Sequence, residues 1–209
     1  IGSSVSQGSK DRKQASIMAA ELVDFCLLYY ANAGDVYVDP FMGQGVQMQV
    51  AWSRGVHYHG CDICEEYVAY IQRVRDLLLE QDDAVVLNVE RGDARSMTHI
   101  EDGIGDFGFT SPPYWDVEYY GPEAEQLGTG HTYEEFLGGI ADVAATWRRK
   151  MKPGARVAVN VNDFRRNGKF YSYHSDTSRA FEQAGWTLED IWIVDGLVGG
   201  LPRAYATQH

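Results

Sequence analysis

The residues best suited to chemistry stand together between Thr110 and Trp115, where the sequence reads TSPPYW. Two prolines fix the backbone and remove two N–H donors, so the neighbouring carbonyl groups are held outward as hydrogen-bond acceptors. Ser111 adds a hydroxyl group and Tyr114 adds a flat ring. Such a set of groups suits an amine attached to a ring. A Pro-Pro-aromatic triplet can also form an ordinary turn, but this one follows a strand whose expected neighbours end in nucleoside-binding residues.

A second group of residues lies between Asp39 and Gly45, where the sequence reads DPFMGQG. Gly43 and Gly45 stand just before an expected helix. The backbone can therefore approach a ligand closely there, and the helix can offer N–H groups to a carboxylate or phosphate. A dinucleotide fingerprint would place a third small residue three positions after Gly45, and Met48 stands there instead. Nicotinamide cofactors are therefore disfavoured.

Carboxylates follow the next two expected strands as well. Asp62 stands seventeen residues after Gly45 and could accept hydrogen bonds from both hydroxyls of a ribose. Asp93, which precedes Ala94, could accept a hydrogen bond from the exocyclic amine of an adenine. Either carboxylate alone could instead cap a helix or a turn. Together with Asp39 and the glycines, they favour a ligand that contains a nucleoside.

The elements that would position these residues alternate between helix and strand. Apolar residues at helical spacing predict helices at residues 14–30, 45–53, 65–79, 133–151 and 175–184, with a short helical piece at 96–101. Short apolar runs predict strands at residues 36–38, 56–61, 84–89, 106–110, 155–161 and 186–194. This order predicts an α/β, Rossmann-like fold, with a mostly parallel sheet, helices on both faces and ligands at the carboxyl ends of the strands.

The two motifs resemble those of the DNA amino-methyltransferases, which use S-adenosylmethionine to methylate N4 of cytosine or N6 of adenine. Asp39 to Gly45 is similar to their cofactor motif of Asp-Pro-Phe, any residue, Gly, any residue, Gly. Ser111 to Tyr114 is similar to their catalytic motif in its Ser-Pro-Pro-aromatic form, which is usual for the N4-cytosine enzymes. The resemblance covers about residues 13–194 and implies the class I methyltransferase fold.

The resemblance implies S-adenosylmethionine as the cofactor. The cofactor-binding candidates are Gln14, Ser16, Asp39, Phe41, Gly43, Gly45, Asp62, Ile63, Asp93 and Ala94. The first two come from a segment before the first strand that contacts the cofactor carboxylate in the family. The group from Asp39 to Gly45 would line the methionine side. Asp62 would hold the ribose, Ile63 would pack on the adenine and Asp93 would bind its amine.

The catalytic candidates implied by the resemblance are Ser111, Pro112, Pro113 and Tyr114. The Ser111 hydroxyl and the Pro112 carbonyl would accept the two amine hydrogens, while Tyr114 stacks on a base flipped out of DNA. The proton would leave after methyl transfer, to water or to a carboxylate such as Asp116 or Asp163. Physical argument alone does not choose cytosine over adenine. The alternatives are an N6-adenine enzyme, an RNA methyltransferase, and a non-catalytic protein that binds cofactor and nucleic acid.

The net charge of −12 argues against a large phosphate-binding surface. One stretch differs, because residues 148–169 hold eight Lys and Arg and one acidic residue. The first three of these cations could close a helix, whose carboxyl end favours positive charge. The nucleic-acid-binding candidates are therefore Trp115, Arg165, Arg166 and Lys169. Polar residues at 160–163 could read the edge of the base or form a turn. Because no separate recognition segment is evident, we expect a short or relaxed recognition element, a separate recognition subunit or a dimer partner.

We expect a single domain at residues 13–209, preceded by a flexible segment at 1–12 and lacking part of its carboxyl-terminal end. Short apolar stretches and a polar start predict a cytoplasmic protein without membrane contact. The resemblance implies a bacterial or phage-encoded enzyme of the restriction–modification type. A redox pair of Cys61 and Cys64 is disfavoured, because the two flank the expected ribose-binding Asp62 and Cys61 fits a small buried residue, and no convincing set of metal ligands is present.

Overall fold

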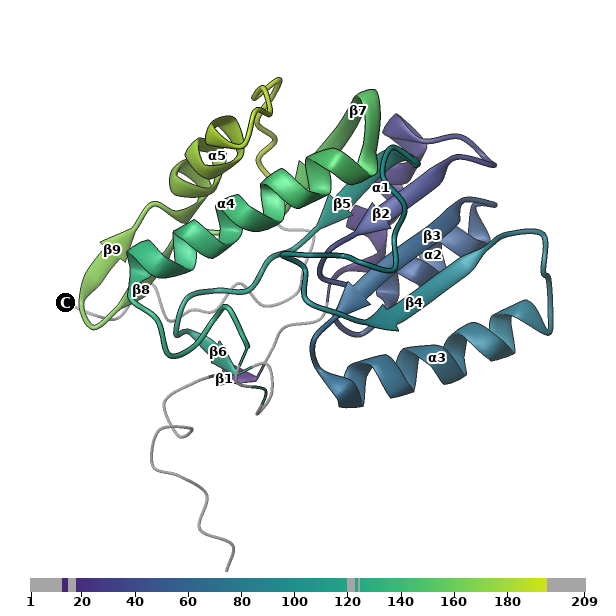
Figure 1. Cartoon of the computed structure of the whole chain (residues 1–209), viewed down its shortest axis with the longest axis horizontal. Coiled ribbons are helices and arrows are strands. Elements are labelled where there is room, and N and C mark those ends of the chain that lie inside the picture. Colours follow the sequence, from purple (N-terminus) through teal and green to yellow (C-terminus); the bar gives the residue numbers. More distant parts are fainter. Residues whose placement is uncertain (1–12, 15–17, 120–122, 124, 195–209) are drawn as a thin grey trace, which may run out of the picture.

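The structure is a computed structural model that describes residues 13–14, 18–119, 123 and 125–194 (Figure 1). The flexible segment expected at residues 1–12 lies outside the described residues, and so does everything after residue 194. No helix among the described residues combines the length and apolar character needed to cross a bilayer.

A five-stranded parallel sheet forms the centre of the described chain. Its strands are β2 (Val36–Asp39), β3 (His57–Asp62), β4 (Leu87–Arg91), β5 (Gly105–Thr110) and β7 (Met151–Val159). They lie side by side in the order β4-β3-β2-β5-β7. β3 and β4 follow one another on one side of β2, and β5 and β7 lie on its other side. The direction in which successive strands are added therefore changes beside β2, which makes this the switch point of the sheet. In sheets of this kind, ligands bind at the carboxyl ends of the strands beside that point.

Helices cover both faces of the sheet (Figure 1). One face packs against α1 (Ala20–Tyr30), α2 (Val46–Ser53) and α3 (Glu65–Leu79), and the other against α4 (Tyr133–Lys150) and α5 (Tyr173–Gln183). Helix α4 begins with a capping box, in which Thr132 and Glu135 each accept the other's main-chain N–H. The α/β, Rossmann-like fold with helices on both faces is therefore confirmed.

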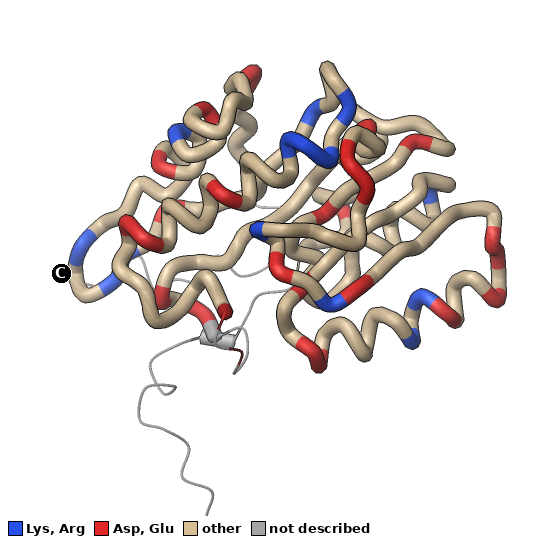
Figure 2. The backbone as a smooth tube through the Cα atoms, viewed as in Figure 1, with Lys and Arg blue, Asp and Glu red and all other residues tan. Residues whose placement is uncertain are grey.

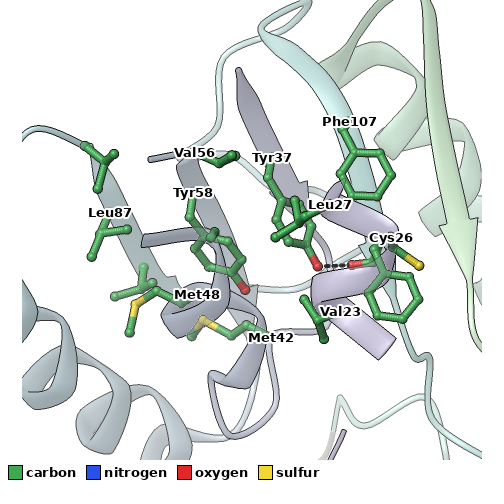
Figure 3. Packing of buried hydrophobic residues seen from close by; sticks show 14 of the residues in the cluster. Val23, Cys26, Leu27, Tyr37, Met42, Met48, Val56, Tyr58, Leu87 and Phe107 are labelled. Atoms are coloured by element: carbon green, nitrogen blue, oxygen red, sulfur yellow. Dashed lines mark hydrogen bonds between the residues drawn. The ribbon is translucent and has the colours of Figure 1, made fainter. Parts of the chain in front are cut away.

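Neighbouring residues of β2 face two separate cores. Tyr37 points into the core beneath α1 and α2, where its ring meets that of Tyr58 edge to face at 5.1 Å and its hydroxyl donates to the Phe109 carbonyl at 2.6 Å (Figure 3). Val38 points into the core beneath α4, beside the fully buried Trp147. The alternation follows from the period of two in a strand, and it explains why the buried strand reads as apolar on both sides.

Two small sheets stand beside the central one. Strand β1 (Lys13–Gln14) pairs in parallel with β6 (Glu118–Tyr119), which ties the beginning of the described chain to the loop after the TSPPYW segment. Strands β8 (Phe164–Arg166) and β9 (Lys169–Tyr171) form an antiparallel hairpin in a stretch for which the sequence analysis predicted no strand. Its turn is Asn167-Gly168, with φ of 52° and 76°. Asn-Gly is the pair that such two-residue hairpin turns prefer.

The strand expected at residues 186–194 is wrong, because that segment has no regular structure. Two of its side chains, those of Trp186 and Trp192, contact helices, while Leu188, Ile191, Ile193 and Val194 are exposed. Trp186 donates its indole N–H to the Ala144 carbonyl of α4 at 2.9 Å. Trp192 stacks on Tyr30 of α1 with ring centroids 5.5 Å apart. The alternating apolar residues that predicted a strand therefore include two tryptophans that contact different helices, α4 and α1.

The helical piece expected at residues 96–101 is also wrong, because the chain makes isolated turns there. Met97 adopts a φ of 43°, which a continuing right-handed helix cannot include. Two expected strands are displaced along the chain: residues 84–89 became Leu87–Arg91, and residues 155–161 became Met151–Val159. The helix expected at residues 14–30 begins at Ala20 within the described residues.

Candidate functional site

The sequence-predicted residues follow four adjacent strands at one edge of the sheet. Asp39 ends β2, Asp62 ends β3, Asp93 follows β4 and Ser111 follows β5. Because these strands are parallel neighbours, their carboxyl ends share an edge. The structure therefore brings the motif from Asp39 to Gly45, both later carboxylates and the TSPPYW segment to the same edge.

Asp39 is fully buried at the end of β2 and accepts three hydrogen bonds. Donors are the Phe41 N–H at 3.0 Å, the Thr110 hydroxyl at 2.7 Å and the Tyr58 hydroxyl at 2.8 Å. Burial raises the pKa of this carboxyl to about 7, although the three donors act in the opposite direction. Asp39 thus joins β2, β3 and β5 and shapes the loop that follows it.

The two glycines of that loop serve different needs. Gly45 has a φ of 76° and begins α2, and a Cβ added there would lie 2.9 Å from the Ile71 side chain. It therefore allows α2 to approach α3 closely. Gly43 has a φ of 50°, and a Cβ added there would meet nothing within 4 Å among the described residues. Its backbone therefore faces open space at the end of β2.

Asp62 is partly buried and accepts hydrogen bonds from two main-chain N–H groups. Gly43 donates to one carboxylate oxygen at 2.9 Å, and Cys64 donates to the other at 2.9 Å. Burial raises its pKa to about 6, and the nearby carboxylate of Glu123 adds to that rise, while the N–H donors lower the pKa. The Cys64 contact is the cap expected as the alternative to ribose binding, and the Gly43 contact ties Asp62 to the glycine loop.

Asp93 forms an ion pair with Arg95. The guanidinium group contacts both carboxylate oxygens, the shortest distance being 2.6 Å, and the Arg95 N–H also donates to Asp93 at 2.8 Å. Burial would raise the pKa of Asp93, but the hydrogen bonds and charge of Arg95 lower it overall. A ligand amine at this position would therefore share the carboxylate with Arg95. Ala94 is buried directly beside it.

Ser111 is partly buried, and its hydroxyl donates to the Asn160 carbonyl at 3.1 Å. Because the single hydroxyl hydrogen is used there, the oxygen can only accept further hydrogen bonds. The Pro113 carbonyl accepts from the buried Tyr173 hydroxyl at 2.9 Å. Within the described part of the chain, the Pro112 carbonyl receives no hydrogen bond. Ser111 and Pro112 therefore present two neighbouring acceptors.

The ring of Tyr114 is held in place from several sides. Its hydroxyl accepts the Asn162 N–H at 2.9 Å, and its ring meets those of Tyr173 at 5.5 Å and Phe164 at 6.0 Å. The next residue, Trp115, donates its indole N–H to the His131 carbonyl at 2.8 Å. The orientation of both rings is therefore set by residues outside the TSPPYW segment.

The remaining candidates are spread over the described chain. Gln14 lies in β1, which pairs with β6 beside the TSPPYW segment, and Ser16 falls outside the described residues. Phe41 and Ile63 follow β2 and β3 at the same edge. Arg165, Arg166 and Lys169 lie in the β8–β9 hairpin, whereas the other cations of this stretch include Arg148 to Lys150 in the last turn of α4. The helix-end explanation thus accounts for those three.

Some partners of the candidates were missed in the sequence. Tyr58 and Thr110 complete the contacts of Asp39, Arg95 pairs with Asp93, and Tyr173 fixes Pro113. Only Arg95, two residues from its partner, could have been found from spacing.

Cys61 is buried and forms no disulfide, with its thiol 3.4 Å from the Pro40 carbonyl, and Cys64 is also a free thiol. No metal-binding group of His, Cys, Asp and Glu forms among the described residues.

The fold is similar to that of several solved methyltransferases. A candidate sarcosine dimethylglycine methyltransferase of Galdieria sulphuraria superposes with a TM-score of 0.54, at 12% identity, over 79% of this chain and 60% of that protein. Phosphoethanolamine N-methyltransferase 2 of Haemonchus contortus, solved with S-adenosylhomocysteine, gives 0.51 at 16% identity, over 79% of this chain and 36% of that protein. A geranyl diphosphate methyltransferase solved with its cofactor gives 0.47 at 19% identity, over 67% of this chain and 48% of that protein. The chain spans half or less of some of these proteins.

A family model described as DNA methylase, of the N6 and N4 type, matches residues 2–73. The match includes the motif from Asp39 to Gly45 and extends past Asp62, but it ends before Ser111. No curated protein sequence matches the chain. The chain is therefore similar to DNA methylases over the part that contains the expected cofactor motif.

Proposed function

We propose that this chain is an S-adenosylmethionine-dependent methyltransferase that acts on the exocyclic amine of a base in DNA. We propose further that this amine is N4 of cytosine. One observation carries the proposal: the Ser111 oxygen and the Pro112 carbonyl, which receives no hydrogen bond from the described residues, follow β5 at the carboxyl edge of the sheet. The family match over residues 2–73 supports a base in DNA as the substrate. The Ser form of the catalytic motif favours cytosine.

The residues at the edge fit the cofactor. Gly43 leaves open space beside the end of β2, where a side chain would otherwise stand. Asp62 and Asp93 supply carboxylate oxygens for ribose hydroxyls and for the adenine amine. Carboxylates at this edge also suit a ligand whose sulfonium and ammonium groups are positive. When bound, the cofactor supplies a methyl group already activated by its positive sulfur.

Ser111 and Pro112 orient the amine. Each accepts one amine hydrogen, which turns the nitrogen lone pair toward the methyl group and stabilises the positive charge that develops on nitrogen. A nitrogen–carbon bond forms as the sulfur–carbon bond breaks, and the amine then releases one proton. Asp116 is paired with Arg166 and Asp163 with His174, so water is the simpler proton acceptor. Tyr114 stacks on the base and offsets part of the cost of flipping it.

The proposal is tested with cofactor that carries a radioactive methyl group. The protein is incubated separately with long unmethylated DNA of mixed sequence, with RNA and with free nucleosides, and label is counted in each acceptor. We expect label in DNA. Label only in RNA would contradict DNA as the substrate while leaving the amine chemistry intact. Cofactor binding by calorimetry without label in any acceptor would favour the non-catalytic alternative.

A further inference from the structure

The β8–β9 hairpin has two faces of different character. In its register, Phe164 lies opposite Tyr171 and Arg165 lies opposite Phe170. Successive residues of a strand point to opposite faces, so the first pair and the second pair face away from each other. The first pair is buried, and both members of the second are exposed. The Asn167-Gly168 turn fixes this register, because a slip of one residue would exchange the faces.

The buried face is attached to the TSPPYW segment by aromatic contacts. Phe164 and Tyr171 stack at 5.2 Å, and Tyr171 also meets Trp115 at 5.2 Å and Tyr133 at 4.6 Å. Phe164 lies 6.0 Å from the ring of Tyr114. The hairpin is thus held by the same two aromatic residues that follow Pro113.

An ion pair strengthens this attachment. Arg166 in β8 contacts Asp116, directly after Trp115, at 2.8 Å, and both side chains are largely shielded from solvent. The pairing also removes Arg166 from the cations that could meet a phosphate. Exposed positive charge on the hairpin therefore comes from Arg165 and Lys169.

The exposed face combines an aromatic ring with positive charge. Phe170 is 51% exposed, and the Arg165 guanidinium lies over its ring at 5.4 Å. Lys169 is exposed next to the turn but belongs to the other face, opposite Arg166, with its ammonium group 4.9 Å from the centre of the Tyr171 ring. Figure 2 shows these basic positions grouped at the end of the molecule formed by the hairpin, which Figure 1 places away from α3. On a chain of net charge −12, this is a local exception.

We propose that the β8–β9 hairpin binds the nucleic acid beside the target base, with Phe170 stacking on a flanking base and Arg165 and Lys169 contacting phosphates. The inference rests on the proposed function and names the residues that contact the nucleic acid beside the target base. Aromatic rings and cations together match the bases and phosphates of a strand whose stacking is disturbed, as it is around a flipped base. Other exposed cations, Arg148 and Arg149, lie at the carboxyl end of α4, whereas the hairpin contacts Trp115 directly.

A purely structural role for the exposed pair is the competing explanation. An arginine over an aromatic ring across two strands stabilises a hairpin by itself. The two roles differ in what they require of residue 170. Hairpin stability needs an apolar or aromatic side chain, whereas base stacking needs a flat ring, so Phe170→Trp and Phe170→Leu separate them.

The experiment compares hairpin variants with matched controls on α3. Phe170→Ala, Phe170→Leu, Phe170→Trp and Arg165→Gln are made in the full chain, and exposed residues of the same types are changed in Tyr70→Ala and Arg73→Gln. Binding to a fluorescent random-sequence duplex is measured by anisotropy from 50 to about 200 mM salt. Methyl transfer to DNA, cofactor binding and melting temperature are measured on each preparation.

We expect Phe170→Ala and Phe170→Leu to weaken binding and methyl transfer about 5- to 100-fold. Phe170→Trp should keep both near the level of the unchanged protein. Arg165→Gln should reduce the slope of log affinity against log salt by about 0.9, as loss of one phosphate contact does. Both α3 variants should behave as the unchanged protein. The proposal is overturned if the hairpin variants bind and methylate DNA normally, or if Phe170→Leu preserves both. If the unchanged protein neither binds nor methylates DNA while binding the cofactor, the proposed function itself has failed.

Discussion

The ends of β2 and β3 hold their carboxylates with both nearby and distant partners, whereas Ser111 and Pro113 at the end of β5 depend on distant ones. Asp39 and Asp62 each accept a main-chain N–H from two residues further along the chain. Ser111 and Pro113 instead contact Asn160 and Tyr173, which lie 49 and 60 residues away. The first region therefore contains local turns, which Tyr58 and Thr110 tie to β3 and β5. The second is assembled from segments far apart in the sequence.

This difference has a functional meaning if the cofactor binds at the first region and the base at the second. A cofactor is the same molecule in every enzyme of the class, so a local and repeatable loop can hold it. Acceptors differ among these enzymes, and a site built from side chains on several elements can change with few substitutions. The two regions should therefore respond differently to mutation.

Removal of the Ser111 hydroxyl should have the largest effect. Ser111→Ala takes away one of the two acceptors that stabilise the developing charge, so kcat should fall about 100-fold or more, as it does for loss of one such group elsewhere. Cofactor affinity by calorimetry should stay unchanged. Ser178→Ala is the matched control, because Ser178 also donates to a main-chain carbonyl, that of His174 at 2.8 Å. A loss of cofactor affinity in Ser111→Ala as large as the loss in kcat would show that Ser111 also belongs to the cofactor site.

Replacement of Asp39 should affect stability more than chemistry. Asp39→Asn places an amide N–H among three donors and should cost about 1–3 kcal/mol in the free energy of unfolding. The cost should depend on pH, because the folded pKa is about 7 and the ordinary value is 3.8. Between these values the unfolded carboxyl is ionised while the folded one keeps its proton, so rising pH destabilises the unchanged protein.

The difference in stability between the unchanged protein and Asp39→Asn should therefore shrink as the pH rises from about 5 to about 8. Urea unfolding at four pH values measures it, and the other titrating groups cancel in the difference. Asp82→Asn serves as the control, since Asp82 is exposed. A difference that grows with pH would show that the folded pKa of Asp39 is lowered.

Gly43→Ala should separate backbone strain from ligand contact. The φ of 50° is costly for alanine, so unfolding should require about 1 kcal/mol less. The added methyl group also enters the open space beside β2, which should weaken cofactor binding. Gly34→Ala is the control, because Gly34 has a φ of 87° and equally open surroundings in a remote turn. If both variants bind the cofactor alike, the space beside Gly43 is not part of its site.

The smallest effect is expected for Tyr173→Phe. It leaves the buried Pro113 carbonyl without its donor, so stability should fall by about 1 kcal/mol and kcat by a few-fold. Tyr37→Phe loses a hydroxyl that donates to the Phe109 carbonyl on the other core, and is the matched control. A fall in kcat for Tyr173→Phe but not for Tyr37→Phe, at similar stability, would mark Tyr173 as a positioning residue.

The comparison also explains how far the sequence alone could lead. Helix α3 was predicted at its observed bounds, because its apolar spacing is a local property of the sequence. The order of strands placed Asp39, Asp62, Asp93 and Ser111 at one edge correctly. The contact of Tyr58 with Asp39 and the aromatic contacts of Trp115 could not be predicted, since they depend on packing between distant segments. The segment at 186–194 failed for the same reason.

Identification of the methylated nucleoside tests the central claim most directly. Long unmethylated DNA is incubated with the protein and S-adenosylmethionine, digested to nucleosides and analysed by mass spectrometry against standards. The account predicts N4-methyldeoxycytidine, formed by the unchanged protein and strongly reduced with Ser111→Ala. N6-methyldeoxyadenosine would keep the mechanism and contradict the choice of base. A methyl group on a carbon atom of a base would contradict the pair of amine acceptors at Ser111 and Pro112.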